Sequence, residues 1–364
     1  MKRRQPGETG AALLTVLILV GIMGAIAVGV FDRLRLATML TGNAGGLEAA
    51  RGFALVGEQL VSVRIDDLIA ASPQRTTLAG GWQGRTITLP LPAGTARARV
   101  IDGSNCFNLN SLVTGTAPDA LVSRSLAIGQ FVNLMLVLDM ARSDARQIAA
   151  AAADWIDSDD RPNADGAEDG AYAAGANAVG AQAGAYAVGA QAGAYAVGAQ
   201  AGAQADVYAG APQPYRTANT LMAEVSELRA VTGVTPALYA RLRPWLCTLP
   251  VAELSPINVN TLLPGQAPLI AMLYGETLAI DAARRVIAER PAGGWPATAE
   301  FWNSPTLRDL PPPGEVLQQV RVTTRWFALD LDVDVGGTQL HETGLIDARQ
   351  PPARIAVRRW TGDE

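Results

Sequence analysis

The chain has 364 residues, with 29 Lys and Arg against 34 Asp and Glu and a formal net charge of -5. This length supports more than one globular part, and the acidic balance argues against a general electrostatic surface for nucleic acid. Lys2 is the only lysine, so P-loop and Schiff-base chemistry have no lysine in the body of the chain. The only histidine, His341, lies in the polar stretch GTQLHETG, which we interpret as a solvated loop without a metal role.

The N-terminus predicts a membrane anchor. Three basic residues, Lys2, Arg3 and Arg4, precede twenty uncharged residues from Ala11 to Val30. Such a stretch is long enough to span a bilayer as a helix, and the basic flank favours a cytoplasmic N-terminus. A cleaved secretory signal is the competing interpretation, but the expected small-residue cleavage site does not follow the apolar core.

Helix-forming residues continue beyond the anchor, with apolar residues at three-to-four spacing and a weak waist at Gly42 to Gly46. We therefore expect one long helix whose outer half packs on a sheet. Alternating runs at residues 86–91 and 96–102 predict a hairpin through residues 92–94.

Two further strands are predicted near the C-terminus, in QVRVTTRWFALDLDVDVGG and ARIAVRRW. Within the first, Asp330, Asp332 and Asp334 alternate with apolar residues and so share one exposed face. These acids form either a solvated face or a cation site, and the sequence favours the solvated face because oxygen cages usually come from loops.

About two hundred residues with helical signals separate the two strand regions. Ser143 is a candidate N-cap, Thr235 precedes Pro236 in the order typical of a helix start, Asn260 is another candidate cap, and residues 279–289 predict a helix. The fold class is therefore α+β, in which a long N-terminal helix packs on an antiparallel sheet and a large, mostly helical domain is inserted between strands.

Seven carboxylates fall within the sixteen positions from 154 to 169. They are Asp154, Asp157, Asp159, Asp160, Asp165, Glu168 and Asp169. Such crowding favours a hard divalent cation such as Ca²⁺, although Arg161 and Pro162 exclude an EF-hand. A solvated acidic loop is the alternative interpretation.

Two other features remain open at this stage. Cys106 and Cys247 match no CxxC spacing and form either one structural disulfide or two buried thiols. Residues 170–206 repeat AGAYAVGAQ almost without bulky aliphatic side chains, which predicts a mobile loop inserted in the helical domain.

The leader ends in Gly10 and is followed by Ala11-Ala12-Leu13-Leu14, which resembles the class III leader of type IV pilins and type II secretion pseudopilins. Thr15 stands where most members have glutamate, a departure typical of the K-type minor pseudopilin. The phrases CFNLN, DWIDSDDRPNADGAEDGAY, PYRTANTLMAEVSELRAVTG and SPINVNT extend the resemblance over most of the chain.

This resemblance implies cleavage after Gly10 by a prepilin peptidase, methylation of Ala11, and a single-pass inner-membrane protein with a periplasmic C-terminal domain. It implies a non-catalytic subunit at the pseudopilus tip that is needed for export of folded proteins. Its partners would be minor pseudopilins I and J, and the major pseudopilin is a further candidate.

The implied Ca²⁺ ligands are Asp157, Asp159, Glu168, Asp169 and, beyond the repeat, Asp206. The implied parts are a leader at 1–10, a transmembrane helix at 11–31, its continuation at 32–78, a pseudopilin core at 79–112 and 315–364, and an inserted domain at 113–314.

The main rival is a membrane-anchored helix-hairpin-helix protein that binds DNA, because residues 255–295 resemble such a repeat. That hairpin would bind phosphate through backbone amides. Here the hairpin reads YGETLAI and places the acidic Glu276 there, with no lysine nearby. We therefore interpret it as a packing unit and expect no nucleic-acid partner.

Overall fold

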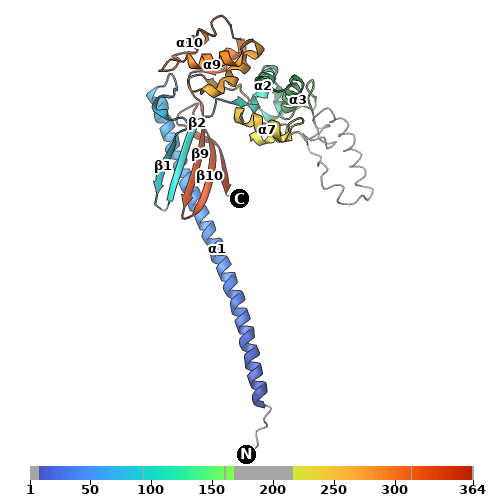
Figure 1. The fold of residues 1–364 in the computed structure, drawn as a ribbon, viewed down its shortest axis with the longest axis vertical. Helices are drawn as coiled ribbons and strands as arrows, with labels where there is room; N and C mark the ends of the chain where they lie inside the picture. The colour runs from blue at the N-terminus through green and yellow to red at the C-terminus, as the bar shows by residue number, and fades with distance from the viewer. Residues whose placement is uncertain (1–7, 93, 160, 168–215, 313, 363–364) are drawn as a thin grey trace, which may run out of the picture.

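A computed structural model describes residues 8–92, 94–159, 161–167, 216–312 and 314–362. One long helix, α1 (Glu8–Ala71), carries an antiparallel sheet along its C-terminal part. A mostly helical body lies at the end of the sheet that faces away from the N-terminus (Figure 1). Residues 168–215 are not among the described residues, so the loop predicted at residues 170–206 lies outside them.

α1 is continuous through Gly42 to Gly46, so the predicted waist does not interrupt the helix. Its outer half buries Ala50, Ala54, Val61 and Ile65, which recur at helical spacing on the side that faces the sheet. The helix ends at Ala71, earlier than the predicted boundary at residue 78, because Pro73 disfavours a helical conformation at the residue before it.

Five antiparallel strands form the sheet in the order β1-β2-β9-β10-β11. They are β1 (Thr86–Leu91), β2 (Gly94–Asp102), β9 (Trp326–Val335), β10 (Thr338–Asp347) and β11 (Arg354–Gly362). β1 and β2 form the predicted hairpin, which closes with Leu91 opposite Gly94. Apolar residues of β9 alternate inward as predicted, and α1 approaches so closely that a Cβ on Gly57 would lie 3.1 Å from a Leu331 methyl.

His341 lies in β10, so its interpretation as a loop residue is wrong. β10 pairs with both β9 and β11 along its length. Its inward positions are Leu340, Glu342, Gly344 and Ile346. Only two of these are large and apolar, so the alternation typical of a strand was hidden by polar composition.

The inserted body connects the end of β2 to the start of β9. Its helices are α2 (Ser125–Val137), α3 (Arg142–Asp154), α7 (Pro236–Leu242), α8 (Ala267–Tyr274), α9 (Ile280–Ala288) and α10 (Thr298–Trp302). Its short strands are β3 (Phe107–Asn108), β4 (Val113–Thr114), β5 (Val122–Ser123), β6 (Leu246–Cys247), β7 (Ile257–Asn258) and β8 (Val320–Arg321).

Two of the four helix signals in this body are confirmed. Thr235 caps α7 by accepting a hydrogen bond from the Leu238 amide, and α9 falls within the predicted residues 279–289. The alanine-rich helix expected after Ser143 is present as α3, but Ser143 is not its cap, because α3 already begins at Arg142 with Ala141 as the N-cap. Asn260 is not a cap either, since its side chain binds the backbone of Trp295.

The inserted body has its own hydrophobic core, separate from the core between α1 and the sheet. Phe107 stacks on Phe131 with ring centroids 4.8 Å apart, and Leu109, Leu112 and Val316 are fully buried in the same core. The predicted boundaries at 112 and 315 therefore fall within this core. In the structure the sheet ends at Asp102 and resumes at Trp326.

Candidate functional site

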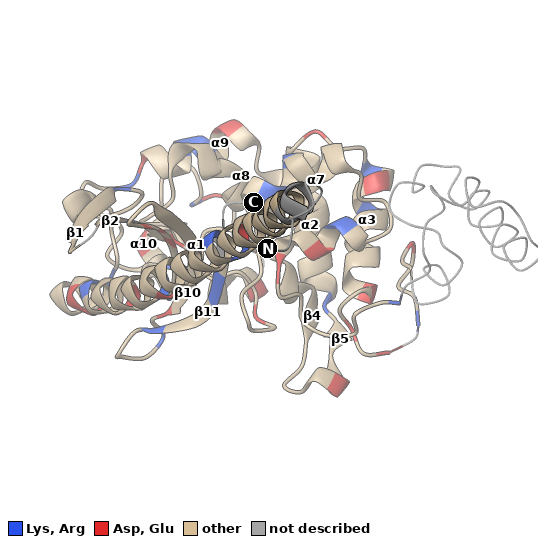
Figure 2. Ribbon diagram, turned by 90° about the horizontal axis from the view of Figure 1, so that it is seen from below, with Lys and Arg blue, Asp and Glu red and all other residues tan. Residues whose placement is uncertain are grey.

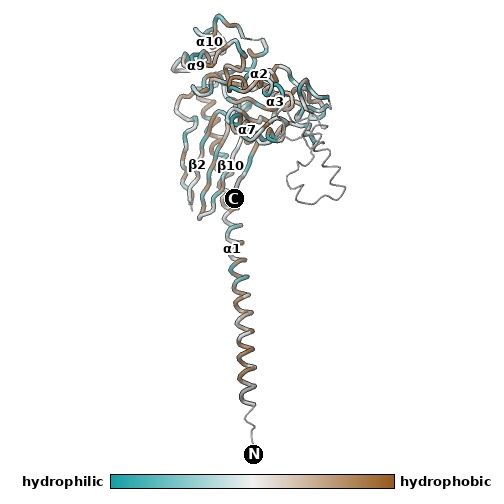
Figure 3. The backbone as a smooth tube through the Cα atoms, turned by 45° about the vertical axis from the view of Figure 1, so that its right-hand side comes forward, coloured by the Kyte–Doolittle hydropathy of each residue, from teal (hydrophilic) through white to brown (hydrophobic). Residues whose placement is uncertain are grey.

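The N-terminal half of α1 projects beyond the sheet and is hydrophobic over most of its length (Figure 3). Its most apolar window has a mean hydropathy of 2.7 with none of it buried in the protein, which suits a membrane span. Large side chains such as Leu17 and Met23 are more than half exposed. This arrangement supports single-pass anchoring. Gly10 and Ala11 lie in α1, and their processing stays a prediction.

Buried asparagines join the sheet region to the inserted body. The Asn258 amide donates to the Thr76 carbonyl at 3.0 Å and to the Thr324 hydroxyl at 2.9 Å. Asn105 in turn accepts from the Asn258 backbone amide at 2.9 Å and donates to Thr261 at 2.9 Å. Each of these side chains forms hydrogen bonds with backbone or hydroxyl groups that are not paired with a neighbouring strand. These bonds hold the junction in one arrangement.

A second pair of asparagines organises the inserted body. Asn108 donates to the carbonyls of Val251 and Glu253, and Asn110 donates to the carbonyls of Met222 and Leu249. The phrases CFNLN and SPINVNT therefore carry structural asparagines, a role that the sequence analysis did not assign to them. The sequence signal that could have indicated this role is a pair of asparagines two residues apart within an apolar stretch.

Asp102 lies at the same junction and is fully buried. It accepts hydrogen bonds from the Ser104 hydroxyl at 2.6 Å and from the hydroxyls of Thr261 and Thr324, each at 2.5 Å. Burial raises the pKa of Asp102, while these donors lower it. The carboxyl group thus connects the last residue of β2 to a segment within the inserted body, at Thr261, and to the segment that leads into β9, at Thr324.

Cys106 and Cys247 form a disulfide with their Cα atoms 5.8 Å apart. The bond joins the neighbourhoods of β3 and β6, which pair in parallel. It closes a sequence separation of 141 residues and so restrains the unfolded chain strongly. Of the two interpretations left open by the sequence, the structure contains the disulfide.

The acidic loop begins where α3 ends. Asp154 and Asp157 are buried, and their carboxyl groups face a small polar network. The Ser123 hydroxyl donates to Asp157 at 2.6 Å, and the Asn163 side chain donates to Ser123 at 2.7 Å and to Asp154. Asp159 is turned to the loop itself, where it accepts from the Arg161 amide at 2.8 Å.

Two oxygens of this loop are suited to a cation. Asp154 Oδ2 and Asp157 Oδ1 are buried, and neither oxygen has a hydrogen-bond partner within the part of the chain that the structure describes. Burial, together with the neighbouring carboxylates Asp154 and Asp159, raises the pKa of Asp157 to about 6. Burial likewise raises the pKa of Asp154. A bound cation would favour the charged form of both groups, so the residues fit a hard metal ion.

The described part of the loop does not supply a complete set of ligands. Asp154, Asp157 and Asp159 do not bring three ligand atoms within 4.8 Å of one another in the part of the chain that the structure describes. The other predicted ligands, Glu168, Asp169 and Asp206, lie outside the described residues. Asp154 was not among the predicted ligands, and its burial marks it as a stronger candidate than Asp159.

A carboxyl pair lies between α1 and the sheet. Arg358 of β11 forms a bidentate ion pair with Glu58 of α1, and Trp360 donates to Glu342 at 2.7 Å. Both glutamates are buried. Burial and the neighbouring Glu58 raise the pKa of Glu342 to about 7. Burial raises the pKa of Glu58, but the hydrogen bonds with Arg358 and Glu342 and the positive charge of Arg358 together lower it below its ordinary value.

The first helix of the segment that resembles a helix-hairpin-helix repeat packs inside the protein. α8 is buried along its length, and the hairpin that follows begins at Gly275, whose φ of 61° suits glycine. Glu276 at this hairpin forms an ion pair with Arg142. Basic and acidic segments are interspersed over the described ribbon (Figure 2). Neither feature favours the DNA-binding alternative.

Comparison with known proteins identifies the family. The models for the type II secretion system protein K match residues 105–188 and 178–251 in one part and 257–323 in another. Type II secretion system protein K of Pectobacterium carotovorum is 31% identical, with 98% of this chain and 97% of that protein covered. The same protein of Aeromonas hydrophila is also 31% identical, with the same coverage.

A solved structure shares the fold. One chain in the crystal structure of the GspK-GspI-GspJ complex from the enterotoxigenic Escherichia coli type 2 secretion system superposes with a TM-score of 0.68 and 25% identity. The match covers 89% of this chain and 99% of that chain. These matches confirm the fold class and the resemblance carried by the leader and the four phrases. The chain therefore belongs to the type II secretion system protein K family and is a minor pseudopilin.

Proposed function

We propose that the protein is a non-catalytic cap at the tip of the periplasmic pseudopilus, anchored in the inner membrane by α1. The observation that supports this position is the inserted body, which covers the end of the sheet away from the anchor (Figure 1). A subunit stacked above would have to displace this body. The cap would therefore end the filament while its own sheet remains free to contact subunits below.

Minor pseudopilins I and J are the proposed partners, by analogy with the GspK-GspI-GspJ complex. An apolar hollow of about 590 Å³ lies between α1 and the β1–β2 hairpin. Its lining includes Leu60 and Ile87, which are 42% and 54% exposed, and Val63 is 58% exposed nearby on α1. An exposed apolar surface of this kind is typical of an interface and suits a helix from a neighbouring pseudopilin.

Co-purification tests this assembly. The full chain, produced with the I and J subunits of the same secretion system, is expected to yield a stable complex of all three in detergent. Ile87→Glu places a charge in the hollow and should weaken complex formation, whereas Val122→Glu, at an equally exposed site in the inserted body, should not. A complex that forms equally with both variants would contradict the proposed interface, and no complex with the unaltered chain would contradict the partners.

Prepilin peptidase is the proposed processing enzyme, acting between Gly10 and Ala11, with methylation of Ala11 afterwards. The leader motif supports this step. Mass spectrometry of the N-terminal peptide from bacterial membranes would show Ala11 as the first residue. Retention of residues 1–10 in the assembled protein would contradict it.

We further propose that Asp154, Asp157 and the acids that follow in the loop bind Ca²⁺. A bound ion would supply positive charge to two buried carboxylates, each of which has one oxygen without a hydrogen-bond donor among the described residues, and it would fix the start of the loop. Calorimetry on the full chain in detergent should show Ca²⁺ binding and a higher melting temperature than in chelator. Asp157→Asn should abolish both effects, while Asp309→Asn, at a fully exposed site, should leave them intact. Binding that survives Asp157→Asn would contradict the ligand assignment.

A further inference from the structure

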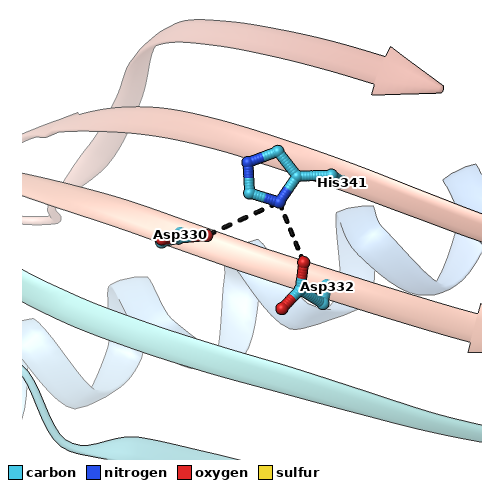
Figure 4. A group of neighbouring side chains, drawn as sticks. All are labelled: Asp330, Asp332 and His341. Carbon is cyan, nitrogen blue, oxygen red and sulfur yellow. Dashed lines mark hydrogen bonds and ion pairs between the residues drawn. The ribbon is translucent and has the colours of Figure 1, made fainter. Parts of the chain in front are cut away.

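A second group of potential ligands lies on the sheet, far along the chain from the acidic loop. Asp330 and Asp332 of β9 and His341 of β10 place one ligand atom each within 4.8 Å of one another (Figure 4). His341 is directly opposite Asp332 in the strand pairing, and Asp330 is two residues away on the same face. This face is opposite the one that packs on α1, because the alternating apolar residues of β9 point the other way.

The distances from His341 to the two carboxylates suit one small ion. His341 Nδ1 lies 2.9 Å from Asp332 Oδ1 and 3.6 Å from Asp330 Oδ1. Two atoms that share a zinc ion at its usual bond lengths are at most roughly 4.2 Å apart. We propose that Asp330, Asp332 and His341 form a binding site for a divalent transition-metal ion of the Zn²⁺ class.

The donor set distinguishes this site from a calcium site. One imidazole nitrogen and two carboxylates suit zinc and related metals, whereas Ca²⁺ requires six to eight oxygen ligands. Both cysteines of the chain are in the disulfide, so no thiolate competes for such an ion. The sequence analysis favoured a solvated face for these aspartates because it did not place His341 on the adjacent strand.

A neighbouring cation lies beside one ligand, and the site is open to solvent. The second oxygen of Asp332 lies 3.8 Å from the Arg97 guanidinium on β2, a separation that allows charge attraction but is too long for a hydrogen bond. A hollow of about 140 Å³, lined in part by Arg97, Asp332 and His341, gives solvent access. Three protein ligands leave a fourth tetrahedral position for water or for a donor from another molecule.

An ion here would join β9 to β10 near the hairpin between them. The hairpin contacts α1, since a Cβ on Gly46 would lie 2.3 Å from the Thr338 hydroxyl oxygen. This hairpin is at the end of the sheet closer to the membrane span (Figure 1), and the site lies between the hairpin and the middle of β9. It is separate from the proposed calcium loop and does not depend on the calcium proposal.

The test uses the full chain without a polyhistidine tag, in detergent, with excess Ca²⁺ to saturate the acidic loop. Because His341 is the only histidine, its imidazole resonances can be followed by NMR during titration with Zn²⁺ alone. We expect one equivalent of Zn²⁺ to shift these resonances and calorimetry to give a micromolar Kd. His341→Ala and Asp332→Asn should each raise the Kd at least about tenfold.

Asp334→Asn is the matched control, because Asp334 is an acid on the same strand and face but outside the ligand group. It should bind Zn²⁺ as the unaltered chain does. The proposal is overturned if Zn²⁺ leaves the His341 resonances unchanged. It is also overturned if all three variants bind Zn²⁺ equally, which would show attraction of the ion by surface charge only.

Discussion

The sheet region and the inserted body are stabilised in different ways. In the sheet region, apolar residues at regular spacing on α1 and β9 meet face to face, and small residues allow close approach. In the inserted body, short helices and two-residue strands are linked by buried asparagines and by the Cys106–Cys247 disulfide. Helices and sheets pair their own backbone N–H and C=O groups by hydrogen bonds. Irregular segments need side chains to form hydrogen bonds with these groups.

Removing the disulfide is expected to have the largest effect, and it should act on the inserted body. The double variant Cys106→Ala/Cys247→Ala should lose about 4 to 5 kcal/mol of unfolding free energy, because the bond closes a long loop. Hydrogen exchange on the full chain should show faster exchange in α2 and α8 than in β9 and β10. Equal acceleration in both regions would mean that they unfold as one unit and would break the comparison.

Leu331→Ala makes the opposite test in the sheet region. Leu331 is fully buried and faces α1 at Gly57, so its truncation should cost about 3 kcal/mol. Exchange should accelerate in β2, β9 and the outer half of α1, with the inserted body unaffected. Leu317→Ala, at a half-exposed position, is the control and should change little. A cost confined to the inserted body would contradict the assignment of separate cores.

The Glu58–Glu342 pair predicts a pH dependence for the sheet region. The folded protein keeps Glu342 protonated up to a pKa of about 7, while the unfolded chain releases that proton near its ordinary pKa of 4.5. Stability should therefore fall as pH rises between these two values, by at most about 1.4 kcal/mol per pH unit. The lowered pKa of Glu58 has its effect below 4.5, outside this range.

Glu342→Gln sharpens this prediction, because the amide resembles the protonated acid. Chelator is kept present throughout so that the acidic loop is free of metal. Between pH 6 and 7.5, above the pKa of Asp157, the variant should be more stable than the unaltered chain and should show a flatter pH profile in urea denaturation. The control Glu300→Gln, at an exposed site, should keep the original slope. An unchanged slope in Glu342→Gln would contradict a raised pKa of Glu342 as the source of the pH dependence.

The smallest expected effect concerns the helical hairpin in the inserted body. Arg142 and Glu276 form an ion pair with both side chains largely exposed. Arg142→Ala should cost less than about 1 kcal/mol, since exposed pairs contribute little. Thermal melting of both proteins at low and high salt would measure this loss of stability. A loss comparable to that of Leu331→Ala would show that the hairpin depends on this pair.

The sequence predicted those parts of the fold that periodicity controls. β1 was placed at its observed residues, and the inward alternation of β9 and the helix after Thr235 were also correct. β10 was missed because Glu342 and Gly344 occupy inward positions that usually hold apolar residues. A buried glutamate is only recognisable once its partners from distant segments are in place.

The candidate sites could be predicted only where their residues are close together along the chain. Crowding along the chain indicated the acidic loop, since all its acids are local in sequence. His341 and Asp332 are nine residues apart and meet only through the β9–β10 pairing, so spacing alone did not connect them. The role of Asn108 and Asn110 depended on carbonyls more than a hundred residues away.

Immunogold labelling of assembled pseudopili tests the central claim most directly. An epitope placed at exposed Asp119 in the inserted body would be followed in cells that lack their own protein K and overproduce the filament. The proposed cap predicts restored secretion and label at one end of each filament only. Label distributed along the filament, with secretion restored, would contradict a tip position.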